Sequence, residues 1–425
     1  MRSNLVKIFT YVFGGFCSQL IILVFWFYVK KEVSLSEIGR YQLGLFFIDI
    51  LAIISMLGID SGYAKLFFNK KKNLDKTVLF LINSAALITF LVFSFLVLLK
   101  IILIPFLNIY SLILIMLGVF VQINFNFFMN KLVIMSKSKE YISFQIARSI
   151  LIVLISAILI KFYQQSSIAL FLGQFFGVGL LLLIMLGVTK IQNTKSKILY
   201  SDSTEILKYT IPLMLSGIIG VITVYSSRLI LSATVTIDQV GALGVYMGFS
   251  SPIIAIIAVI NKFYYPFVIK KLSNKEDLNK LYPYFFYIVS GYIFLFYMGV
   301  LSYYLYFREI LFADKLIENS FVFLHLAASS IIIVLYTLYS PVFVFNNTKK
   351  LLIANIGSLL IGSVFQYILL LNYGFKVVGY GKIIMDLLAL IFSMLLFKKE
   401  HQFNRNDVLL LIFIIIAIVP ILFLK

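Results

Sequence analysis

Residues 78–99 read VLFLINSAALITFLVFSFLVLL and contain no charged side chain. An α-helix needs about 20 mostly apolar residues to cross the hydrocarbon core of a bilayer, so this stretch is long enough to span it. Lys76 and Lys100 stand just outside its two ends. The stretch therefore predicts a membrane-spanning helix, and similar stretches recur along the whole chain.

The composition of the chain fits a membrane protein. Of 425 residues, 62% are hydrophobic and 12% are charged, whereas a soluble domain is about 25% charged. The net charge of +19 lies in short clusters between apolar stretches, which is typical of membrane topology and argues against nucleic-acid binding. Cys17 is the single cysteine, and His325 and His401 lie far apart, so we expect no disulfide, no metal site and no cofactor.

Thirteen stretches are long and apolar enough to span. We expect them near residues 8–29, 41–67, 78–99, 109–130, 141–160, 166–189, 208–231, 241–268, 283–306, 319–345, 351–371, 377–397 and 408–424. The last of these is interrupted by Pro420. The fold class is therefore predicted to be all-α, with 12–13 transmembrane helices.

The basic residues of the connections alternate between the two sides of the membrane. The N-terminus and every second connection after it hold 21 Lys and Arg, and the other connections hold eight. Because cytoplasmic loops carry the excess of positive charge, this alternation predicts a cytoplasmic N-terminus.

A short internal repeat indicates two halves of equal topology. Ser36-Glu37-Ile38-Gly39 opens the second expected span, and Ile237-Asp238-Gln239-Val240-Gly241 opens the eighth. Six spans per half would give both halves one orientation, as in transporters built from parallel repeats. We therefore expect an N-terminal lobe over 1–190, a cytoplasmic linker over 191–207, a C-terminal lobe over 208–398 and an additional helix over 399–425.

Acidic residues within the spans need a physical reason, because a charge at the bilayer centre costs about 2.5–3.5 kcal/mol. Asp49 and Asp60 are eleven residues apart and so share one face of a helix, which indicates a face toward a polar cavity. Alternatively, Asp60 caps a break at Gly58 and pairs with Lys65. Lys382 and Asp386 are i,i+4 neighbours that can neutralise each other.

Basic residues within the spans have two readings. Arg228 lies near the outer end of its span, where it either extends to the interface or lines a cavity and holds an anion. Arg148 and Lys262 lie near cytoplasmic ends, which favours extension of the charged group to the interface.

No loop exceeds about 15 residues, and the chain has no phosphate-binding loop and no Ser/His/Asp set. Since an enzyme acting on a soluble substrate usually needs an extramembrane catalytic surface, we expect a transporter and not an enzyme.

Two groups of motifs carry a resemblance to a known family. The first is Glu37-Ile38-Gly39-Arg40-Tyr41 with Leu57-Gly58-Ile59, and the second is Tyr209-Thr210-Ile211-Pro212-Leu213 with Ser227-Arg228-Leu229-Ile230-Leu231. With these motifs the chain resembles the O-antigen-type polysaccharide flippases of the multidrug/oligosaccharidyl-lipid/polysaccharide exporter superfamily. The family often has Asp where this chain has Ser227, and Arg where it has Lys65.

The resemblance implies a V-shaped bundle of two six-helix lobes with alternating access, in a bacterial cytoplasmic (inner) membrane. The cargo would be an undecaprenyl-diphosphate-linked oligosaccharide, moved to the periplasmic leaflet for O-antigen, lipopolysaccharide or capsule synthesis, with a polysaccharide polymerase as a partner. A diphosphate needs a basic path through the membrane. The candidates for this cationic lining are Arg228, Arg40, Arg148, Lys262 and Lys65.

Two alternatives stay open. The first is a multidrug or cation exporter of the same superfamily, in which Asp49, Asp60 and Asp386 would couple transport to H⁺ or Na⁺. The second is a membrane glycan polymerase or ligase, although such proteins typically carry a large periplasmic loop that this chain lacks.

Overall fold

The computed structural model describes most of the chain. The described residues are 2–59, 74–99, 109–135, 137–163, 166–188, 200–234, 236–250, 253, 257, 264, 268, 282–307, 321–346, 348–396 and 405–422. They are almost entirely helical and contain no β-strand, so the predicted all-α fold class is confirmed.

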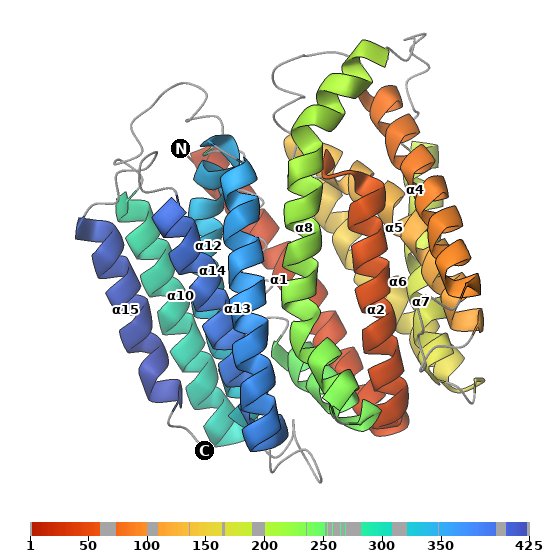
Figure 1. Ribbon diagram of the computed structural model, residues 1–425. Coiled ribbons are helices and arrows are strands. Elements are labelled where there is room, and N and C mark those ends of the chain that lie inside the picture. Colours follow the sequence, from red (N-terminus) through yellow and green to blue (C-terminus); the bar gives the residue numbers. More distant parts are fainter. Residues whose placement is uncertain are drawn as a thin grey trace. The chain divides into compact units, whose positions relative to one another are not determined.

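The chain divides into two compact units, Met1–Tyr225 and Ser226–Lys425 (Figure 1). Unit 1 contains α1 (Arg2–Glu32), α2 (Leu35–Met56), α4 (Leu74–Leu98), α5 (Ile109–Ile134), α6 (Ser138–Ile160), α7 (Ser166–Val188) and most of α8 (Tyr200–Thr234). Unit 2 contains the end of α8, a helix over 237–250, α10 (Tyr282–Ser302), η2 (Tyr303–Phe307), α12 (Phe321–Asn346), α13 (Thr348–Tyr373), η4 (Gly374–Val377), α14 (Val378–Leu396) and α15 (Arg405–Leu422).

Nine segments among the described residues are long and apolar enough to cross a membrane. One of them, Lys349–Leu396, contains both α13 and α14, which the short η4 turn joins. The turn begins at Gly374, whose φ of 67° lies in the left-handed region that favours glycine. The predicted multi-pass character of the chain is confirmed, and each expected span contains described helical residues, whereas the number of 12–13 spans stays a prediction.

Close helix contacts in unit 1 depend on small residues. Gly173 and Gly177 of α7 lie against Ser156 and Ile152 of α6, and an added Cβ would come within 2.9 Å of the Ser156 Cα and the Ile152 amide nitrogen. Helix α1 also presents a small residue to α6, because Ser18 hydrogen-bonds Ser149 at 2.5 Å. Without large side chains in the way, the helix backbones approach closely.

Unit 2 repeats the helix pairing of unit 1. In unit 1, α6 and α7 pack together and α7 also packs on α5; in unit 2, α13 and α14 pack together and α14 also packs on α12. Gly39 and Gly241 are each the fifth residue of their helices. This is the pattern that an internal repeat predicts, whereas the division into two lobes at a linker stays a prediction.

The structure corrects three expected helix boundaries. The second span does not run unbroken to residue 67, because α2 ends at Met56, where Leu57 has a φ of 52° and Gly58 a φ of 69°. A side chain at Gly58 would also collide with the Thr210 carbonyl of α8, so the predicted break at Gly58 is confirmed with a packing reason.

The other two corrections concern α8 and α15. Helix α8 begins at Tyr200 and not at residue 208. Its first two turns are polar, so the hydropathy of the sequence did not mark them as part of a span. Part of the expected linker 191–207 is therefore helix. Pro420 lies inside α15 and does not end it.

Candidate functional site

Helix α2 positions the acidic residue of the candidate site in unit 1. The helix begins after Ser34, whose hydroxyl accepts a hydrogen bond from the Glu37 amide at 3.4 Å, and Glu37 lies in the first turn, where an acid is favourable. The cap fixes the start of a 22-residue helix that carries Tyr41 and Asp49.

Tyr41 and Asp49 of α2 hydrogen-bond other helices of unit 1. The Tyr225 hydroxyl of α8 donates to Asp49 Oδ2 at 2.7 Å. The Tyr41 hydroxyl donates to Gln174 Oε1 of α7 at 3.1 Å. Three helices therefore supply hydrogen-bonding groups at membrane depth.

Helices α5 and α6 add a basic group. Arg148 of α6 donates to Gln122 Oε1 of α5 at 3.1 Å, and Gln122 donates to Asn126 Oδ1 at 2.8 Å. The Arg148 guanidinium also lies 5.4 Å from the ring centroid of Phe125, within cation–π range. The expectation that Arg148 extends to the interface is wrong, because these contacts turn its side chain inward toward α5.

These side chains form one electrostatic group, which we call the unit 1 polar cluster. It consists of Tyr41, Asp49, Gln122, Arg148, Gln174 and Tyr225. Arg148 interacts electrostatically with both Tyr41 and Asp49. Tyr225 is buried, and the other five side chains are half-buried, so the cluster borders open space and is not sealed in the core. It can therefore receive an ion or a polar group of a ligand.

Arg40 has a different partner. Its guanidinium forms an ion pair with Glu37, whose other carboxylate oxygen accepts hydrogen bonds from the Ser167 amide at 3.0 Å and hydroxyl at 2.6 Å. Glu37 thereby satisfies amide donors at the start of α7. The structure thus gives Glu37 and Arg40 a role in tying α2 to α7, and a role of Arg40 in substrate binding stays a prediction.

Unit 2 contains a second set of polar side chains. Arg228 of α8 is only 7% exposed and donates to Met247 Sδ at 3.1 Å. Next to it in sequence, Ser226 and Ser227 hydrogen-bond the amide of Gln366 on α13, which is fully buried. The Arg228 side chain therefore has a partner within unit 2, the sulfur of Met247.

The predicted Lys382–Asp386 pair is confirmed. The Lys382 ammonium lies 2.6 Å from Asp386 Oδ1, and the two side chains are 7% and 10% exposed. Ser329 of α12 is a further hydrogen-bonding neighbour of Asp386. Burial together with mutual neutralisation is the arrangement expected for charges at membrane depth.

The structure brings together only part of the predicted site. Asp49 and Arg148 meet in the unit 1 polar cluster, while Arg228 and Asp386 lie in unit 2. Asp60, Lys65 and Lys262 lie outside the described residues. Among the residues that the structure describes, no group of three His, Cys, Asp or Glu could hold a metal ion.

Of the unit 1 polar cluster, the sequence singled out Asp49 and Arg148, and it did not identify Tyr41, Gln122, Gln174 or Tyr225 as site residues. Gln174 is the single amide side chain of the apolar helix α7, and its rarity in a span was a usable signal. Tyr225 gave no such signal, because tyrosine is common throughout the chain.

The fold is similar to that of solved structures of MATE transporters and of a transporter of the MOP superfamily. A MOP-superfamily transporter from Pyrococcus furiosus has a TM-score of 0.68 at 14% identity, over 97% of this chain and 96% of that one. A point mutant of the Vibrio cholerae MATE transporter VcmN has a TM-score of 0.62 at 15% identity, over 96% of this chain and 99% of that one.

The similarity extends to eukaryotic structures. The eukaryotic MATE transporter AtDTX14 has a TM-score of 0.61 at 13% identity, over 99% of both chains. No family model and no curated protein matches the chain by sequence. The chain therefore shares its fold with multi-pass membrane transporters.

Proposed function

We propose that the protein is a secondary transporter that exports its cargo across the cytoplasmic membrane and couples this export to H⁺ or Na⁺ through the unit 1 polar cluster. The observation that carries the proposal is the position of Asp49 within a spanning helix, hydrogen-bonded by Tyr225 and facing Arg148. Fold similarity to MATE transporters supports the same class of function.

The position of Asp49 suits ion coupling. Ionisable side chains within spans are costly, and those that persist usually mark ion paths or substrate sites. Apart from Tyr41, which lies in the second turn of α2, the cluster lies along the middle turns of its helices, the depth at which secondary transporters bind substrate and coupling ion. A cation that binds Asp49 would neutralise a charge that Arg148 otherwise faces, and so would change the affinity of the cluster for cargo.

A second candidate function, the flipping of a lipid-linked oligosaccharide, is supported by the arginines within the spans. Arg148 and Arg228 both lie within spans, and the chain has 36 basic residues against 17 acidic ones. A guanidinium matches phosphate oxygens with two parallel hydrogen bonds, as a lipid-linked oligosaccharide would require. The Pyrococcus furiosus transporter is described as having a binding pocket of reverse polarity that suggests a different function. The charge of the site is therefore the feature that we expect to decide the cargo of this protein.

Transport in vesicles distinguishes the candidates. Purified protein in proteoliposomes is given an H⁺ or Na⁺ gradient, and the efflux of a fluorescent organic cation is followed. Asp49→Asn should lower the gradient-driven rate by about tenfold or more, equivalent to ~1.4 kcal/mol of barrier. Asp238→Asn is the matched control, because Asp238 is exposed at the start of its helix.

Equal gradient-driven efflux rates for the D49N and D238N proteins would contradict ion coupling at Asp49. Transport at a rate that is independent of both gradients would also contradict it. Loss of a lipid-linked oligosaccharide from the outer leaflet on Arg148→Ala and Arg228→Ala, without gradient-driven cation efflux, would favour the flippase instead. Protein levels are compared by immunoblot in every case.

A further inference from the structure

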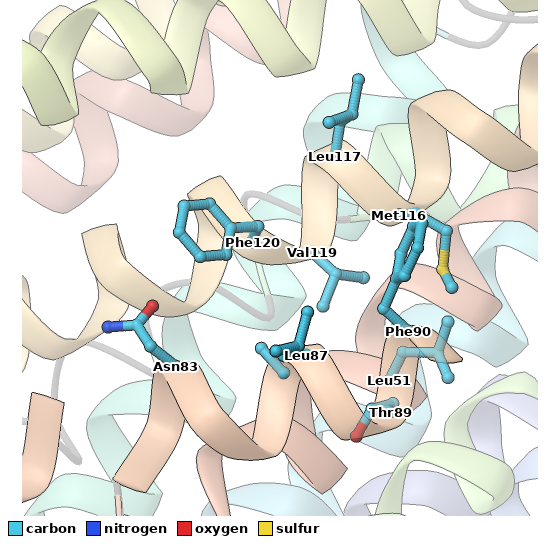
Figure 2. Close-up of a pocket in the computed structure, with 10 residues that line it drawn as sticks. Leu51, Asn83, Leu87, Thr89, Phe90, Met116, Leu117, Val119 and Phe120 are labelled. Atoms are coloured by element: carbon cyan, nitrogen blue, oxygen red, sulfur yellow. The ribbon is translucent and has the colours of Figure 1, made fainter. Parts of the chain in front are cut away.

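Unit 1 has a pocket that is separate from the polar cluster. It lies between α4 and α5, with Leu51 of α2 at its base, and its volume is about 250 Å³ (Figure 2). The lining residues are Leu51, Asn83, Ala86, Leu87, Thr89, Phe90, Met116, Leu117, Val119 and Phe120. Since Leu51 follows Asp49 by two residues, about 200° around α2, that helix separates the pocket from the acidic group.

Specific contacts tie α4 to α5 on one side of the pocket. Asp75 at the start of α4 forms an ion pair with Lys131 near the end of α5. Further along, the amides of Asn83 and Asn124 hydrogen-bond each other reciprocally, at 2.9 and 3.3 Å. These contacts fix an antiparallel register for the two helices.

The same register places apolar side chains around the pocket. Four residues beyond Asn83 on α4 is Leu87, and four residues before Asn124 on α5 is Phe120. Figure 2 shows Leu87 on one helix and Phe120 on the other, around the pocket. Both are large apolar side chains, 61% and 51% exposed, so the pocket opens at the surface of unit 1.

We propose that this pocket holds the hydrocarbon chain of a membrane lipid. Leu87 lies at the middle of α4, so the opening faces the depth at which the bilayer is pure hydrocarbon. Water does not fill apolar cavities, and an empty cavity forfeits the dispersion contacts of its lining. A hydrocarbon chain supplies those contacts at no cost in desolvation.

The polar groups of the lining do not favour a headgroup. Among the residues that the structure describes, none of the side chains that line the pocket is charged. The Asn83 amide is already engaged with Asn124 and with the Leu79 carbonyl at 2.8 Å. An apolar cavity of about 150 Å³ holds a benzene molecule, so this larger pocket accommodates several carbons of a chain. Recognition is therefore by shape and apolar contact, and it is independent of headgroup.

The single tryptophan of the chain makes a fluorescence test practical. In a Trp26→Phe background, Phe120→Trp places a probe in the pocket, and Phe176→Trp places a control on α7. Phe120 and Phe176 are both 51% exposed, so contact with bulk lipid is matched. The purified full-length proteins in detergent are titrated with phosphatidylglycerol or phosphatidylethanolamine brominated at mid-chain, which quenches tryptophan on contact.

The F120W protein should show saturable quenching at a stoichiometry of about one lipid per protein, with half-saturation at about tenfold less lipid than for F176W, or ~1.4 kcal/mol. The two headgroups should give the same curve. Filling the pocket by Ala86→Phe, or independently by Val119→Phe, should remove the saturable phase.

Coinciding curves for F120W and F176W would overturn the proposal, as would quenching that persists in both filled variants. Quenching by one headgroup alone would also overturn it, in favour of a headgroup site. Because organic-cation efflux does not enter this measurement, failure of the lipid site and failure of the proposed transport function are distinguishable.

Discussion

Replacing Lys382 by Met removes one half of the buried ion pair on α14 and leaves the other half in place. The two charged atoms are 2.6 Å apart, with side chains 7% and 10% exposed. Loss of one partner from such a pair costs about 3–5 kcal/mol, because the remaining charge is buried without compensation. In a unit of roughly 200 residues each kcal/mol shifts the melting midpoint by about 2–4 °C, so K382M should melt about 6–20 °C lower.

A double-mutant cycle separates the interaction from the single losses. Asp386→Leu should destabilise by a similar amount, whereas the K382M/D386L protein should melt near the wild type, because an apolar replacement of a whole buried pair is often neutral or stabilising. The assay is the fraction of monodisperse protein that remains after heating in mild detergent. Acidification should rescue K382M but not D386L, since protonation neutralises the Asp386 carboxylate.

An exposed pair provides the control. Lys137 and Glu140 are 4.0 Å apart and about half exposed, so Lys137→Met should change stability by less than about 1 kcal/mol. Two results would refute this reasoning. One is a loss of stability in K382M/D386L equal to the sum of the two single losses. The other is a K382M melting midpoint no lower than that of K137M.

Two further pairs of substitutions test the contacts of α7. Gly173→Ala would place a Cβ 2.9 Å from the Ser156 Cα, so it should destabilise the protein by about 1–3 kcal/mol. Gly187→Ala should be neutral or stabilising, because nothing lies within 4 Å of its added Cβ. Equal melting midpoints for the two variants would contradict this packing. Glu37→Ala should cost about 1.5–3 kcal/mol, because it leaves the Ser167 amide and hydroxyl without their charged acceptor. Glu37→Gln should cost less, because it retains an acceptor oxygen. The reverse order in the same melting assay would contradict the role of Glu37 as the acceptor at the start of α7.

The positions of the described helices could be predicted because they depend on local hydropathy. The Lys382–Asp386 pair could also be predicted, since its two members are one helical turn apart. The polar start of α8 was not, because hydropathy detects the membrane-crossing part of a helix and not its extension beyond the bilayer.

The composition of the unit 1 polar cluster could be predicted only in part. Asp49 and Arg148 stood out as charges in apolar helices, but their mutual proximity depends on how α2 packs against α5 and α7, and on how α6 packs against those two helices. The link between Asp49 and Tyr225 joins residues 176 positions apart, and no periodicity within either helix encodes it. The position of Arg148 near a helix end can be read from the sequence, but its contact with Gln122 on another helix cannot. The direction of its side chain was therefore predicted wrongly.

The dependence of helix contacts on a few glycine and serine residues has an evolutionary consequence. Where Gly173 meets Ser156, and where Gly362 of α13 meets Met385, the space for a side chain is absent and substitutions are restricted. Bilayer-facing positions can instead drift among Leu, Ile, Val and Phe with little penalty, so overall similarity between homologues erodes quickly while the architecture persists. Alignments of such distant transporters should therefore be anchored on the small residues at helix crossings rather than on the bulk of the hydrophobic sequence.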